Sequence, residues 1–144
     1  MRVETYLKQG LLLDKRINYH IKELGDLQID ACNISAPAIG RDKVMTSPSG
    51  DAPFVKALLR IEELQEKINR EIDTLVDLRN QIESVIRQVK EDNLQLLLIY
   101  KYREGMTNDE ISGLFHVDAS TVVRWHRKAI NEIELPDDLI IARF

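Results

Sequence analysis

Short polar and cationic side chains gather late in this chain, and their chemistry suits contacts with nucleic acid. The candidate contact residues are Thr107, Asn108, Ser120, Thr121, Val123, Arg124, Arg127 and Lys128. Hydroxyl groups bond to base edges or phosphates, Arg124 can pair bidentately with guanine, and Val123 can contact a thymine methyl group. Arg127 and Lys128 suit contacts with the phosphate backbone, and such contacts position a protein on DNA without reading its sequence.

Two helices joined by a tight turn would position these side chains. Thr107 and Glu110 form a T-x-x-E capping box that predicts a helix from Thr107 to about Phe115. His116-Val117-Asp118 is the turn, in which position 116 often needs a positive φ. Asp118 suits the N-cap of a helix from Ala119 to about Ile133. The N-terminus of the first helix could place backbone N–H groups on a phosphate.

The apolar spacing completes a three-helix unit. The inner positions are Ile111, Leu114, Phe115, Val117, Val122, Trp125 or His126, Ala129 and Ile133. A preceding helix is predicted from Leu94 to about Arg103, capped by Asn93 and ended by Gly105. Residues 93–135 are therefore interpreted as a helix-turn-helix domain whose helix 119–133 enters the major groove of double-stranded DNA.

The N-terminal half predicts a long helical hairpin. Residues 3–29 show the periodicity of an amphipathic helix. A second helix is predicted to begin near Pro53, and its apolar residues recur every seven positions: Ile61, Ile68, Leu75, Ile82 and Val89. Companion positions are Leu58, Ile72 and Ile86 on one flank and Leu64, Leu78 and Val85 on the other. We expect an all-α fold with an antiparallel hairpin or coiled coil over 1–92, a linker at about 31–53, and a C-terminal tail, 136–144. The tail is expected to pack on the body or on a second subunit.

Other classes of protein find no support in the sequence. No phosphate-binding glycine loop, nucleophile elbow or HExxH motif occurs, so no enzyme activity and no cofactor are expected. The three histidines lie in different elements, and the single cysteine, Cys32, has no partner for a disulfide or a zinc site, so no metal is expected. No apolar run approaches the roughly 20 residues of a membrane span, and no signal peptide is evident, so we expect no membrane association and a cytoplasmic location.

The segment YREGMTNDEISGLFHVDASTVVRWHRKAI resembles the region 4-like DNA-binding module of sigma factors. Together with TYLKQGLLLDKRINYHIKEL and INREIDTLVDLRNQIESVI, it resembles the sigma-like proteins of Gram-positive phages and prophages, akin to the ArpU and RinA late-gene regulators. The resemblance implies transcription regulation of late phage genes and contact with host RNA polymerase. The promoter-melting segment of a complete sigma factor is not found in this sequence.

Charge bears on how such a protein would bind. The net charge is -4, yet residues 119–133 hold three bases against one acid. Because these cations are few, we expect a single copy of the chain to bind DNA with modest affinity. We therefore expect a homodimer or higher oligomer that reads half-sites about 34 Å apart. Two alternatives remain: a small terminase subunit that recognises DNA for packaging, and a helical scaffold protein that does not bind DNA.

Overall fold

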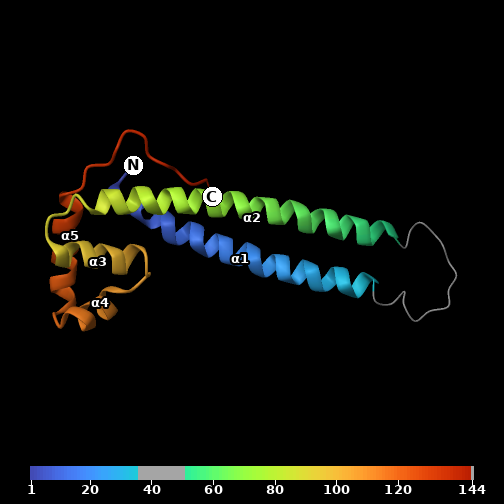
Figure 1. The fold of residues 1–144 in the computed structure, drawn as a ribbon. Coiled ribbons are helices and arrows are strands. Elements are labelled where there is room, and N and C mark those ends of the chain that lie inside the picture. The colour runs from blue at the N-terminus through green and yellow to red at the C-terminus, as the bar shows by residue number, and fades with distance from the viewer. Residues whose placement is uncertain (36–50, 144) are drawn as a thin grey trace. The chain divides into compact units, whose positions relative to one another are not determined.

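The computed structural model describes residues 1–35 and 51–143, and within them the secondary structure is helical (Figure 1). Along these described residues, five helices follow one another: α1 (Val3–Ser35), α2 (Asp51–Ile86), α3 (Asp92–Tyr102), α4 (Asn108–Phe115) and α5 (Ala119–Asn131). No strand occurs in these ranges. The predicted all-α class is confirmed, with two long antiparallel helices followed by three short helices that pack together.

The bounds of the two long helices differ from the prediction. α1 continues six residues past the expected end at 29. α2 begins at Asp51 rather than near Pro53 and ends at Ile86, before Val89, the last position of the predicted heptad stripe. Ala31 is buried and so extends the packed face of α1 into the predicted linker. The rest of that linker, 36–50, lies outside the described residues.

The heptad stripe of α2 faces α1 over most of its length. Ile68, Leu75 and Ile82 are buried and Ile61 is half-buried, as the strict spacing predicted. Val89 is buried as well, but it lies beyond the end of α2. The flank of Leu64, Leu78 and Val85 is buried too. The other flank departs from the prediction, because Leu58 and Ile72 are exposed and only Ile86 is buried. A two-helix interface covers about one side of each helix, so the second flank has no neighbour for much of its length.

Compact packing divides the chain into two units. One comprises Arg16–Asp73, and the other comprises Met1–Lys15 together with Thr74–Phe144. The predicted division of the sequence at residues 92 and 135 stays a prediction.

A polar cluster lies inside the unit of Arg16–Asp73. Glu71 Oε1 is 2.6 Å from His20 Nδ1, and Glu71 Oε2 is 3.0 Å from Arg16 Nε. The side chains of His20 and Glu71 are only 10% and 12% exposed, so this cluster ties α1 to α2 at a buried position.

In the other unit, the first residues of α1 and the last turns of α2 carry the C-terminal tail. Three glutamines, Gln9 on α1, Gln81 on α2 and Gln88 just beyond the end of α2, bond through their side-chain amides to the backbone of the segment 134–142. They are called here the tail-binding glutamines, although the partner of Gln88, Glu134, directly precedes the predicted tail, 136–144. Gln88 Nε2 donates to the carbonyl of Glu134 at 2.9 Å, and its Oε1 accepts from the N–H of the same residue at 3.1 Å. The bonds of Gln81 and Gln9 to residues 138–142 show that the tail packs on the body of its own chain, the first of the two predicted arrangements.

Gln81 and Gln9 hold the later part of the tail. Gln81 donates to the carbonyl of Asp138 at 3.0 Å and accepts from the N–H of Ile140 at 2.9 Å. Gln9, which is only 3% exposed, donates to the Ile140 carbonyl and accepts from the Ala142 N–H at 2.8 Å. The hydroxyl of Tyr6 also donates to Gln81 Oε1 at 2.6 Å, and burial raises the pKa of Tyr6 to about 12. The tail backbone thus finds partners without forming a strand.

Candidate nucleic-acid interface

The start of α4 confirms Thr107 as the N-cap and the first of the two bonds of the predicted capping box. Thr107 is the N-cap, and its Oγ1 accepts a hydrogen bond from the Glu110 N–H at 3.2 Å. The same hydroxyl donates to Glu110 Oε1 at 3.2 Å. These bonds satisfy an N–H group that would otherwise lack a partner in the first turn, so the sequence pattern alone sets where α4 begins.

The turn between α4 and α5 also follows the prediction. His116 lies in the left-handed region at φ 56°, ψ 44° and forms the C-cap of α4. The N–H of Val117 closes the turn on the Ser112 carbonyl at 3.1 Å. Asp118 is the N-cap of α5 by backbone geometry, without a side-chain capping bond. The left-handed residue thus ends α4, and α5 begins three residues later, at Ala119.

The end of α3 depends on a second left-handed position. Gly105 has φ +70°, and the next N–H, of Met106, donates to the Tyr100 carbonyl at 3.0 Å. Glycine adopts this conformation without the steric cost of a side chain. The start of α3 differs from the prediction, because Glu91 is the N-cap and Asn93 lies inside the helix. Glu91 is the N-cap by backbone geometry alone, without a side-chain capping bond. The two-residue difference is within the usual uncertainty of a helix end.

The three short helices bury one side of α5 and leave the other exposed. Val122, Ala129 and Ile111 are completely buried between the helices. The predicted contact residues of α5 fall on the outer side: Ser120, Val123, Arg124, Arg127 and Lys128 are exposed and Thr121 is half-buried. The structure thus brings these predicted residues together on one helical surface.

The two contact residues predicted at the start of α4 are less available. The Thr107 hydroxyl is taken up by the capping box, and Asn108 Oδ1 accepts from Lys101 Nζ at 2.8 Å. The first turn also carries Asp109 and Glu110, whose negative charges oppose a phosphate at that helix end.

Lys128 has an acidic partner within the chain. Its Nζ lies 2.7 Å from Glu91 Oε1, next to the N-terminus of α3. This hydrogen bond raises the pKa of Lys128. Both side chains remain more than half exposed, so the pair is weak and exchanges readily with solvent or with another anion.

A polar link between α3 and α5 is a feature that the sequence did not predict. The hydroxyl oxygen of Tyr102 lies 2.6 Å from His126 Nε2. Burial, followed by the positive charge of Lys101, lowers the pKa of His126 to about 4, and burial raises the pKa of Tyr102. The ring of His126 is therefore neutral at pH 7. The 24-residue separation of the two side chains leaves no local pattern from which the bond could be found.

Aromatic rings fill the space beside this link. Phe115 makes edge contacts with Tyr100 on α3 and with Trp125 on α5, at centroid distances of 6.0 and 5.8 Å. All three rings are half-buried. Trp125 therefore contributes to packing within the unit, as its inward position in the sequence pattern predicted.

Within residues 1–35 and 51–143, no three His, Cys, Asp or Glu side chains come together in a way that could hold a metal ion. None of the helices described is both long enough and apolar enough to cross a bilayer. Comparison of the chain with protein-family models, with curated proteins and with solved structures gave no match.

Proposed function

We propose that this chain is a sequence-specific, double-stranded-DNA-binding transcriptional regulator of the phage or prophage type, with α5 in the major groove. The observation that carries the proposal is the two-sided character of α5. Val122 and Ala129 are buried against α3 and α4, while hydroxyl, apolar and cationic side chains share the exposed side. A helix fixed on one side and polar on the other can approach base edges without disturbing its core.

Different roles are assigned to the α5 side chains by their position. Arg124, near the start of the helix, is proposed to pair with a guanine, and the neighbouring Val123 to contact a thymine methyl group. Arg127 and Lys128, one turn later, are proposed to contact phosphates. Because Lys128 pairs with Glu91 in the structure, binding a phosphate would exchange one anionic partner for another.

The small number of cations supports binding as an oligomer. The α5 helix offers three, so one copy would neutralise few phosphates and bind modestly at physiological salt. We therefore propose a dimer or higher oligomer on paired half-sites, and host RNA polymerase as a second partner of the same chain.

Selection of duplexes from a random DNA pool, followed by fluorescence anisotropy on the selected site, tests the proposal. Arg124→Ala should lower affinity for that site by about 1–3 kcal/mol and relax one base position, because it removes a bidentate base contact. Lys128→Ala should weaken binding to every sequence alike, and the exposed Lys22→Ala on α1 serves as the matched control. The proposal would be contradicted if the chain bound no duplex in a salt-dependent manner. It would also be contradicted if Arg124→Ala bound the selected site as tightly as the natural chain does.

A further inference from the structure

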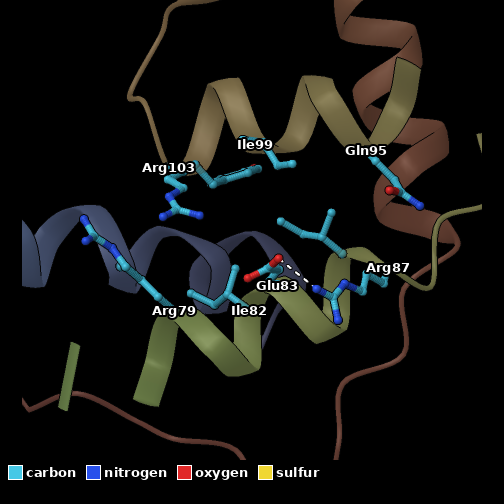
Figure 2. A pocket seen from close by; sticks show the side chains of 10 residues that line it. Arg79, Ile82, Glu83, Arg87, Gln95, Ile99 and Arg103 are labelled. Carbon is cyan, nitrogen blue, oxygen red and sulfur yellow. Dashed lines mark hydrogen bonds and ion pairs between the residues drawn. The ribbon is translucent and has the colours of Figure 1, made fainter. Parts of the chain in front are cut away.

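A partly enclosed pocket lies between the start of α1, the end of α2 and α3, apart from the exposed side of α5 (Figure 2). Its volume is about 120 Å³. The inner wall is apolar and is formed by Gly10, Ile82, Ile86, Ile99 and the ring of Tyr102. A cavity of about 150 Å³ lined by apolar side chains accepts benzene, so this space fits a single ring or a short branched chain.

Three arginines stand around the apolar wall. Figure 2 shows Arg79 and Arg103 at one end of the pocket and Arg87 at the other. Arg87 pairs with Glu83 at 2.9 Å, and Arg79 pairs with Asp14 at 3.3 Å.

Arg103 differs from its two neighbours. It is exposed and has no ion-pair partner within the part of the chain that the structure describes. The three guanidinium groups and two carboxylates therefore leave one net positive charge beside an apolar space. A planar guanidinium group matches a carboxylate through two parallel hydrogen bonds.

We propose that this pocket binds a small organic anion, an aromatic or short branched-chain carboxylate. Its apolar body packs on Ile82, Ile86 and Ile99, and its carboxylate pairs with Arg103. A neutral molecule of the same shape gains only the apolar contacts, and a cation is repelled by the arginines. The proposal goes beyond DNA binding, since it concerns a different surface and a different class of ligand.

Few contacts separate a ligand in the pocket from α5, the helix proposed to bind DNA. Tyr102 lines the pocket and bonds to His126 on α5. A ligand packed against the Tyr102 ring thus contacts a residue that lies one hydrogen bond from the helix proposed to read DNA.

Titration of the full ¹⁵N-labelled chain with benzoate, followed by amide chemical shifts, tests the proposal without any DNA. Benzoate should shift the amides of Gly10, Ile82 and Ile99 and bind about tenfold more tightly than benzyl alcohol, because charge-assisted hydrogen bonds exceed apolar contact alone. Benzylammonium should not bind. Shifts scattered over the surface, no shifts with millimolar benzoate, or equal affinity for benzoate and benzyl alcohol would overturn the proposal.

Two variants locate the ligand. Arg103→Gln should lower the affinity for benzoate about tenfold and leave benzyl alcohol unchanged, whereas the exposed Arg60→Gln on α2 should change neither. Gly10→Ala places a methyl group 3.5 Å from Ile82 Cδ1, an ordinary contact, so the chain should fold. That methyl group occupies part of the pocket and should therefore weaken the binding of both benzoate and benzyl alcohol. Unchanged benzoate affinity in both Arg103→Gln and Gly10→Ala would show that the anion binds elsewhere.

Discussion

His126 shows how one side chain makes the three-helix unit sensitive to pH. The folded chain holds the ring neutral, with a pKa of about 4 against an ordinary value of 6.5. Protonation therefore favours the unfolded chain, in which the ring is hydrated. The contribution of His126 to stability is complete above pH 6.5 and is lost as the pH falls toward 4. Three charged groups act on the ring: Lys101 and Lys8 lower the pKa of His126, and Glu4 raises it.

We predict that the free energy of unfolding of the natural chain decreases as the pH is lowered from 7 to 5. His126→Gln keeps a side chain able to bond to Tyr102 but does not titrate, so it should flatten this dependence. Chemical denaturation at several pH values measures the effect. His116→Asn, at an exposed position whose left-handed backbone asparagine tolerates, is the control and should keep the slope. Equal slopes for His126→Gln and the natural chain would contradict the assignment.

At the scale of elements, the tail depends on the facing parts of α1 and α2. Of the tail-binding glutamines, Gln9 lies on α1 and Gln81 on α2, and both bond to the backbone of the tail. Gln81 is central to this arrangement, because it contacts Asp138, Ile140 and the Tyr6 hydroxyl. A single side chain thus connects α1, α2 and the tail.

Gln81→Ala should destabilise the chain by about 1–3 kcal/mol, because it removes three hydrogen bonds and leaves the Tyr6 hydroxyl without its acceptor. The amides of Ile140 and Ala142 should also exchange faster with solvent. Denaturation and hydrogen exchange measure the two effects. The exposed Gln28→Ala on α1 is the matched control, and unchanged exchange at Ile140 would show that the tail is held by other contacts.

At the scale of the whole molecule, exposed apolar side chains on the two long helices favour association with a second copy of the chain. Tyr19 and Ile29 on α1, and Val55, Leu58 and Leu59 on α2, are between 46% and 64% exposed. Leu58 belongs to the flank of the heptad pattern that α1 leaves uncovered. A second copy that packs on this flank would bury it, in agreement with the proposal that DNA is bound by more than one chain.

Light scattering coupled to size exclusion should therefore give at least twice the mass of one chain. Leu58→Lys combined with Leu59→Lys should shift the mass toward the monomer, because charge replaces the apolar contact. Asn80→Lys, also exposed on α2, should not change it. A strict monomer both with and without DNA would count against the oligomer, and a closed ring of many subunits would favour the terminase alternative.

The sequence by itself determined the local features: the capping box of Thr107 and Glu110, the left-handed turn at His116, and the heptad stripe of α2. These depend on residues within one or two helical turns, so spacing and side-chain type suffice. Tertiary structure decided which heptad flank is covered, where the tail lies, and the bonds of Lys128 and His126. Such contacts join residues between 24 and 133 positions apart, and only the packing of whole helices brings them together.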